Sequence, residues 1–223
     1  MSAFTDKFDS LVIENFATDE ECKQLIDIVE AGDKHGATIG AERVSDTSIR
    51  NNLTAYLDAP KSIRDKINKL LQSKGVKTDT YERVQVQIYE PGQYYKEHHD
   101  SWDENQLCKA DGTSPKQRSW TCVLYLNEVD GGGGTYFPLV DKRVMPKKGQ
   151  VACWNNLGPD GKTNQLTKHM GEDVTAGKKY LANFWYNTKS ACAGKKKGGK
   201  RNRVVAVLVL AVLVVLSLFL YKR

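Results

Sequence analysis

Hydrophobic residues in the first third of the chain follow a helical period. An amphipathic helix is predicted over residues 18–31, because Thr18 followed by Glu21 has the form of a capping box. Its apolar residues recur on one helical face: Cys22, Leu25, Ile26 and Val29. The same spacing predicts a second helix from Pro60, which suits a first helical turn, to about Gln72.

Beyond these helices the period changes to two. Apolar residues alternate with glutamines over residues 84–88, and three β-rich runs follow, WTCVLYL, GQVACW and KYLANFWY. Strong turn signals separate the strands: Pro91-Gly92, the glycine run 131–134 and residues 158–161. Helices followed by a run of strands predict an α+β domain.

Length and charge favour one domain that does not bind nucleic acid. A chain of 223 residues holds one domain with a hydrophobic core and a short appendage. Much of the net charge of +6 comes from six basic residues between Lys195 and Arg203, whereas the preceding residues mix acids and bases. We therefore expect a domain over residues 1–190, followed by a flexible Lys- and Gly-rich linker over residues 191–203.

The five cysteines are scattered and contain no CxxC pair, so the sequence predicts neither a disulfide framework nor a zinc site. Cys122 and Cys153 lie in apolar, strand-like runs. A cysteine in such a run is usually a small buried hydrophobe. Both are therefore expected to be free thiols.

Two histidines and one aspartate have the spacing of a metal site. His98 and Asp100 follow a predicted strand, and alternate strand residues project to the same face, so both can reach one ion while His99 points away. His169 lies far downstream in another strand-rich stretch. Two imidazoles and a carboxylate form the facial triad of non-haem iron, which leaves coordination positions open for a co-substrate and dioxygen. His35 is expected to be an ordinary surface or core residue.

Three further motifs accompany this triad: YEPGQYY at residues 89–95, GTYFP at 134–138 and GKKY at 177–180. Together with the triad, they make the sequence resemble the prolyl 4-hydroxylase catalytic family over roughly residues 9–187. The resemblance implies a double-stranded β-helix, or jelly roll, with helices packed outside. It also implies an Fe(II)- and 2-oxoglutarate-dependent dioxygenase that consumes O2 and uses ascorbate as a reductant when turnover is uncoupled.

The resemblance further implies which residues bind 2-oxoglutarate. Lys179, ten residues after His169, stands where the family's Gly-x-Lys-Trp motif places a lysine that pairs with the distal carboxylate. Lys178 is the competitor, and we expect it to point to the opposite face of the strand. The other implied cofactor contacts are Tyr89, Thr135 and Trp185. Each of these three is also an ordinary residue for a strand or an aromatic core.

A second set of family positions implies a peptide substrate. These positions are Arg43, Ser45, Glu82, Tyr95 and Arg118. Such groups could hydrogen-bond the backbone of a proline-rich peptide, whose polyproline II shape exposes unpaired carbonyls. The alternative for each is a solvated surface side chain. The implied products are 4-hydroxyproline in the peptide, succinate and carbon dioxide.

The sequence departs from the family pattern at three places. Asp173 replaces a proline after the distal histidine, Tyr180 replaces a tryptophan, and Gly133-Gly134 stands where Gly-Glu is usual. None removes a metal ligand, but each bears on peptide preference. Two alternative functions therefore stay open: a 2-oxoglutarate-dependent hydroxylase of another residue or small molecule, and a non-catalytic jelly-roll module held at a membrane.

An uncharged apolar segment at residues 204–221 is long enough to form a transmembrane helix across a bilayer core of about 30 Å. The N-terminal residues do not have the pattern of a signal peptide, so the sequence predicts a single-pass, C-terminal tail anchor. The basic residues between Lys195 and Arg203 favour a cytoplasmic catalytic domain, with the endoplasmic reticulum as a suitable host membrane. The same residues could contact anionic lipids.

Overall fold

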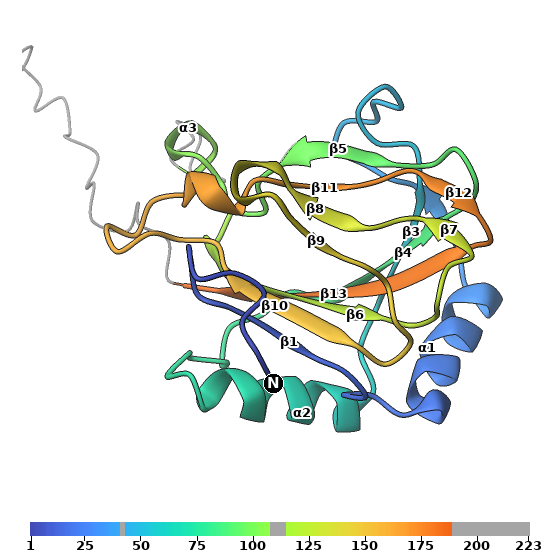
Figure 1. The fold of residues 1–223 in the computed structure, drawn as a ribbon, viewed down its shortest axis with the longest axis horizontal. Helices are drawn as coiled ribbons and strands as arrows, with labels where there is room; N and C mark the ends of the chain where they lie inside the picture. Colours follow the sequence, from blue (N-terminus) through green and yellow to red (C-terminus); the bar gives the residue numbers. More distant parts are fainter. Residues whose placement is uncertain (41–42, 108–114, 189–223) are drawn as a thin grey trace, which may run out of the picture. The chain divides into compact units, whose positions relative to one another are not determined.

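Two β-sheets lie face to face in the computed structural model, which describes residues 1–40, 43–107 and 115–188 (Figure 1). The larger sheet has the strand order β1-β10-β6-β13-β4-β3-β2. Its strands are β1 (Ser10–Ile13), β2 (His35–Gly36), β3 (Leu53–Leu57), β4 (Val84–Tyr89), β6 (Arg118–Tyr125), β10 (Val151–Asn155) and β13 (Lys179–Asn187). This mostly β arrangement is that of a jelly roll.

The smaller sheet has the order β5-β11-β8-β9, and a two-stranded ribbon, β12-β7, accompanies it. These strands are β5 (Tyr95–His98), β7 (Gly131–Gly132), β8 (Thr135–Phe137), β9 (Lys142–Val144), β11 (His169–Gly171) and β12 (Val174–Ala176). Three short helices lie in the connections: α3 (Glu104–Leu107) and the 3-10 turns Pro138–Val140 and Gln165–Thr167.

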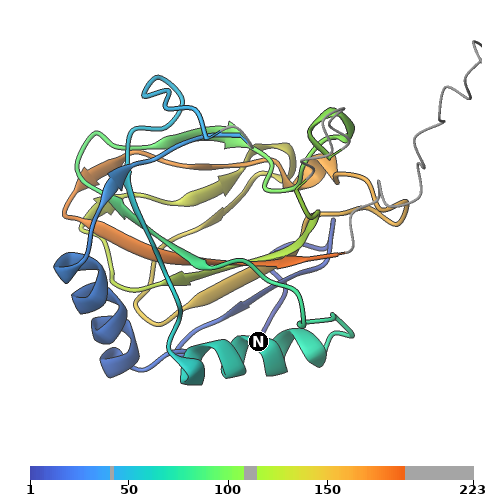
Figure 2. The same ribbon diagram turned by 180° about the vertical axis from the view of Figure 1, so that it is seen from behind.

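Both predicted helices are present and cover the outer face of the larger sheet (Figure 2). Helix α1 (Asp19–Ala31) begins with the predicted capping box: Glu21 N–H donates to Thr18 Oγ1 over 3.2 Å, and Thr18 N–H donates to Glu21 Oε2 over 2.9 Å. Helix α2 (Lys61–Gln72) follows Pro60, which is its N-cap. The apolar helical faces are buried in one core with the sheet: Cys22, Leu25, Val29, Ile63, Ile67 and Leu71.

The central strands are buried on both faces. Successive residues therefore point alternately into two different cores. On β6, Cys122 and Leu124 belong to the core beneath the helices, whereas Val123 and Tyr125 belong to a second core between the sheets. On β4, Gln85 and Gln87 are almost fully buried and line the internal cavity. Polar residues at alternate positions thus mark the inside of the jelly roll.

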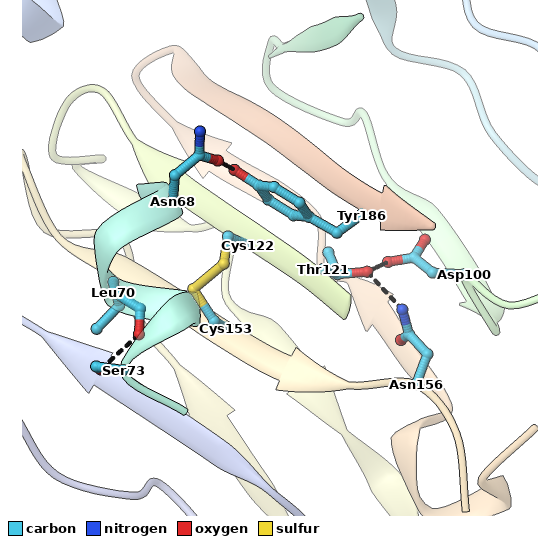
Figure 3. The surroundings of a disulfide bond; sticks show 9 residues. All are labelled: Asn68, Leu70, Ser73, Asp100, Thr121, Cys122, Cys153, Asn156 and Tyr186. Carbon is cyan, nitrogen blue, oxygen red and sulfur yellow. Dashed lines mark hydrogen bonds between the residues drawn. A yellow bond between two sulfur atoms is a disulfide. The ribbon is translucent and has the colours of Figure 1, made fainter. Parts of the chain in front are cut away.

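The expectation of free thiols is wrong for Cys122 and Cys153, which form a disulfide (Figure 3). The two residues are directly opposite in the β10–β6 register, and both side chains point to the helix-covered face. Sequence spacing alone does not reveal this pairing because it depends on which strands become neighbours. Cys22 is free and buried, within the part of the chain that the structure describes.

The glycine run expected as a turn contains a strand. Gly131 and Gly132 form β7 and pair with β12, while Gly132 and Gly133 adopt φ values of 68° and 70°. A side chain at Gly132 would place its Cβ 2.1 Å from the Asp173 carbonyl oxygen, so only glycine fits this approach.

The described residues contain no helix that is long and apolar enough to cross a membrane. The linker expected at 191–203 and the helix expected at 204–221 lie outside the described residues. Both therefore stay predictions.

Candidate metal centre and cosubstrate pocket

The smaller sheet brings the predicted metal ligands together. His98 ends β5 and His169 begins β11, where the two residues are register partners, and Asp100 follows two residues after His98. The three candidate ligand atoms lie within 4.8 Å of one another. The distance is 3.8 Å from His98 Nε2 to Asp100 Oδ1 and 3.8 Å from His169 Nε2 to Asp100 Oδ2. These groups face one another without a direct hydrogen bond.

A backbone carbonyl contacts Nδ1 of each imidazole. His98 Nδ1 lies 2.8 Å from the Lys96 carbonyl oxygen, and His169 Nδ1 lies 2.9 Å from the Thr167 carbonyl oxygen. A carbonyl only accepts, so each Nδ1 carries the proton and each Nε2 offers its lone pair to the centre. Carbonyl contacts of this kind at the second ring nitrogen orient metal-binding histidines.

The protonation states suit a divalent cation. Burial raises the pKa of Asp100, but the nearby His169, His98 and Arg118 and a hydrogen bond from Thr121 outweigh it and lower the pKa to about 2. Burial and the charge of His169 hold the pKa of His98 well below its usual value. A neutral imidazole beside an ionised carboxylate is the state in which these groups bind a metal.

Aromatic rings pack against the two histidine ligands. The Tyr95 ring stacks on His98 with 3.6 Å between the ring centroids. Trp154 and Phe137 pack against His169 at 5.0 Å and 5.4 Å between centroids. The predicted substrate residue Tyr95 thus also contacts a metal ligand directly.

The centre opens into a cavity of about 1110 Å³ that also contains Lys179. The Lys179 side chain is fully buried, and its Nζ donates to the Gly133 carbonyl oxygen over 2.5 Å. Burial lowers the pKa of Lys179 to about 7, against a smaller opposing effect of Glu172. Within residues 1–40, 43–107 and 115–188, no carboxylate lies within ion-pair distance of Lys179 Nζ. A buried cation that lacks a counter-ion is suited to an anionic ligand.

Two hydroxyls predicted to assist Lys179 also line this cavity. Tyr89 is the register partner of Lys179 on β4, and its hydroxyl donates to Gln87 Oε1. Thr135 Oγ1 accepts a hydrogen bond from the Tyr125 hydroxyl over 2.8 Å, which leaves the Thr135 proton available to a ligand. Sequence analysis missed Tyr125, because nothing in the apolar run WTCVLYL marks one aromatic residue as a hydrogen-bond donor.

Lys178 points away from the cavity. Its Nζ lies 3.0 Å from Glu30 and 3.8 Å from Glu90, and its side chain is partly exposed. The two adjacent lysines therefore have opposite surroundings: Lys178 is at the surface with acidic partners, and Lys179 is buried without an acidic partner among the described residues.

Two of the predicted peptide-binding residues bind each other. Arg118 Nε and Nη2 each donate over 2.7 Å to the Glu82 carboxylate. The Arg118 guanidinium carbon lies 3.7 Å from the Trp185 ring centroid and 4.8 Å from that of Trp102. This fixed group, which includes the predicted cofactor contact Trp185, lines the cavity wall.

The loop carrying Arg43 and Ser45 is only partly at the cavity. Arg43 lines it and lies 5.8 Å from the Tyr56 ring centroid, whereas Ser45 is exposed and is not a lining residue. Sequence analysis overlooked Arg50, whose buried guanidinium donates to Gln85 and lies 4.4 Å from the Tyr95 ring centroid. The glutamines that alternate with apolar residues on β4 were the sequence pattern that could have predicted a polar cavity wall here.

Comparison with known proteins gives three informative matches. The 2OG-Fe(II) oxygenase superfamily matches residues 84–187. The viral collagen prolyl hydroxylase of Paramecium bursaria Chlorella virus 1, solved as a 2OG complex, is 31% identical with a TM-score of 0.62. That match covers 82% of this chain and 97% of the viral chain. The chain belongs to the prolyl 4-hydroxylase family of 2-oxoglutarate- and Fe(II)-dependent oxygenases.

The family also includes much longer proteins. Prolyl 4-hydroxylase subunit alpha-1 of Gallus gallus is 34% identical over 140 residues, which are 61% of this chain but 27% of the chicken subunit. A Trichoplax adhaerens prolyl hydroxylase, solved with a hypoxia inducible factor peptide fragment, shares the fold at 17% identity and a TM-score of 0.61. Membership in the family implies Fe(II) as the metal cofactor and 2-oxoglutarate and O2 as co-substrates, and ascorbate is typical of such prolyl hydroxylases.

Proposed function

We propose that this protein hydroxylates peptidyl proline, giving 4-hydroxyproline, with 2-oxoglutarate converted to succinate and carbon dioxide. The observation that carries the proposal is the shared cavity: the cluster of His98, Asp100 and His169 and the buried cation of Lys179 line the same space. The 31% identity to a viral collagen prolyl hydroxylase supports proline as the target.

The residues fit Fe(II). His98 and His169 would bind it through Nε2 and Asp100 through its carboxylate, because both Nδ1 atoms are engaged with carbonyls and the carboxylate is ionised. Bound Fe(II), with 2-oxoglutarate and O2, supplies the oxidising power that replaces a C–H bond of proline by C–OH.

The chain's own groups hold the co-substrate. Lys179 pairs with the distal carboxylate of 2-oxoglutarate, and Thr135 adds a hydroxyl hydrogen bond to it. Tyr89 adds another when its hydroxyl proton turns from Gln87 to the carboxylate. All three side chains are almost fully buried, so water is excluded from this end of the cavity. Because these residues hold the distal carboxylate, the keto acid would lie with its other end towards His98, Asp100 and His169.

The rest of the cavity suits an extended peptide. Its lining includes the aromatic residues Tyr56, Tyr81, Trp102 and Trp185. Aromatic surfaces bind polyproline II segments, whose ring faces stack while their carbonyls accept hydrogen bonds. Arg43 is a cation placed to donate to such carbonyls. Arg50 already donates to Asn52, Thr38 and Gln85, and Arg118 is paired with Glu82, so these two arginines fix the wall.

Succinate formation tests the proposal against its alternatives. The protein is incubated with Fe(II), 2-oxoglutarate, ascorbate and a proline-rich peptide, and with the same peptide carrying alanine at every proline. We expect succinate and hydroxyproline from the first peptide and only uncoupled background from the second. Oxygen transfer to lysine-containing peptides or to small metabolites alone would assign a different substrate. Absence of succinate under every condition would indicate a binding module.

A further inference from the structure

A buried hydroxyl contacts the acidic metal ligand from the larger sheet. Thr121 on β6 is fully buried, and its Oγ1 lies 2.7 Å from Asp100 Oδ2 (Figure 3). An ionised carboxylate only accepts, so the Thr121 hydroxyl must donate its single proton to Asp100. The contact is charge-assisted, a stronger kind than a bond between neutral groups.

Asn156 fixes the direction of that proton. Its Nδ2 donates to Thr121 Oγ1 over 2.9 Å, so the lone pairs of Thr121 face Asn156 and its proton faces Asp100. Asn156 is itself fully buried, and its backbone is held on both sides: its N–H donates to the Ser119 carbonyl over 2.7 Å, and its carbonyl accepts from Asn164 N–H over 2.9 Å. The side-chain amide is therefore presented to Thr121 by a fixed backbone.

The geometry points to a relay in which Asn156 orients Thr121, and Thr121 orients the Asp100 carboxylate for metal binding; this proposal rests on the metal role of Asp100 proposed above. Asp100 lies in the loop after β5, two residues beyond His98, which ends the strand. The hydrogen bond from Thr121 joins the Asp100 carboxylate to β6, and Asn156, directly after β10, holds Thr121 in turn. Thr121 and Asn156 are positioning residues, since neither belongs to the ligand cluster.

The test measures metal affinity directly, with Mn²⁺ as a redox-stable probe whose free concentration is followed by electron paramagnetic resonance. Thr121→Val keeps the shape of the side chain and removes the hydroxyl. We expect it to weaken Mn²⁺ binding about 10- to 100-fold, the usual effect of losing an outer-shell partner. Thr121→Ser retains the hydroxyl and should bind nearly as tightly as the wild type. Asn156→Leu should give a smaller loss than Thr121→Val, because Thr121 can still donate.

Ser119→Ala is the matched control. Ser119 lies two residues away on the same strand, and its buried hydroxyl donates to the Tyr186 carbonyl instead of a metal ligand. It should lower stability without weakening Mn²⁺ binding. Wild-type affinity in Thr121→Val, or an equal loss in Ser119→Ala, would overturn the relay. Wild-type affinity in Asp100→Ala would instead overturn the metal site itself, so the two failures are distinguishable.

Discussion

Lys179 and Lys178 are neighbours in sequence with opposite roles in the structure. Lys179 is buried with a single carbonyl acceptor, and Lys178 forms ion pairs with Glu30 and Glu90 at the surface. Burying an ammonium without a counter-ion costs free energy, which a bound carboxylate can recover. We infer that recovery of this free energy, when the carboxylate of 2-oxoglutarate pairs with Lys179, favours binding of the co-substrate.

Replacement of each lysine by alanine separates the two roles. Removing one partner of a buried charge pair costs about 2–5 kcal/mol, so Lys179→Ala should raise the KM for 2-oxoglutarate at least about 30-fold. Lys178→Ala is the matched control and should change it little, because exposed ion pairs contribute at most about 1 kcal/mol. Steady-state kinetics at varied 2-oxoglutarate would contradict the assignment if the ranking were reversed.

The pH dependence of 2-oxoglutarate binding follows from the same burial. The pKa of Lys179 is lowered to about 7, so the free protein progressively loses this proton above pH 7. Pairing with a carboxylate requires the protonated form, so the KM should be nearly constant below pH 7 and rise above it, approaching about tenfold per pH unit.

Lys179→Arg provides the comparison, since a guanidinium stays charged throughout this range. Its KM should lack the rise above pH 7, whatever its absolute value. The same slope in Lys179→Arg and in the wild type would show that another group titrates.

At the scale of elements, β7 and β12 shape the wall beside Lys179. Gly133, which accepts the Lys179 hydrogen bond, follows β7 directly, and Val174 on β12 is the register partner of Gly132. The close approach of the two short strands at Gly132 leaves no room for a side chain. The ribbon therefore fixes the carbonyl that orients the buried lysine.

Two glycine substitutions test this close approach. Gly132 and Gly161 have similar φ values of 68° and 73°, but a Cβ at Gly161 would meet nothing within 4 Å. Gly161→Ala should cost only the left-handed strain of about 1–2 kcal/mol. Gly132→Ala should cost about 1–3 kcal/mol more, through overpacking against the Asp173 carbonyl. Equal losses in denaturant unfolding would contradict the packing described at β7.

Local signals were sufficient for the helices, the main strands and the metal motif. The capping box at Thr18 and the alternation on β4 depend on neighbours in sequence. The Cys122–Cys153 bond and the Asn156–Thr121 contact depend on which strands are neighbours, and the Tyr125–Thr135 contact depends on how the two sheets pack, so no local pattern could reveal them. Residue type and spacing predict the metal role of His98, Asp100 and His169, whereas the role of Lys179 rests on motif resemblance, and the structure adds the geometry of all four.

At the scale of the whole molecule, two features make opposite predictions about the compartment. The basic residues at 195–203 beside the apolar segment 204–221 favour a membrane span with the catalytic domain in the cytoplasm. The Cys122–Cys153 bond is of a kind that persists in oxidising compartments. We retain the cytoplasmic orientation as our proposal, because the disulfide is buried beneath the helices, away from soluble reductants.

Protease added to intact microsomes distinguishes these orientations. We expect the catalytic domain to be digested while the apolar segment stays with the membrane. Protection of residues 1–190 until detergent is added would place the domain in the lumen. Recovery of intact protein in the soluble fraction would show that residues 204–221 do not anchor the chain.

Isotope transfer from dioxygen to a peptide tests the account most directly. The protein, Fe(II), 2-oxoglutarate and a proline-rich peptide are incubated under ¹⁸O₂, and the peptide is sequenced by mass spectrometry, in parallel with His169→Ala. We predict one ¹⁸O atom on a proline ring with the wild type and none with His169→Ala, whose fold is checked by circular dichroism. An unlabelled peptide with the wild type, or equal labelling with the variant, would contradict a proline hydroxylase that depends on His98, Asp100 and His169.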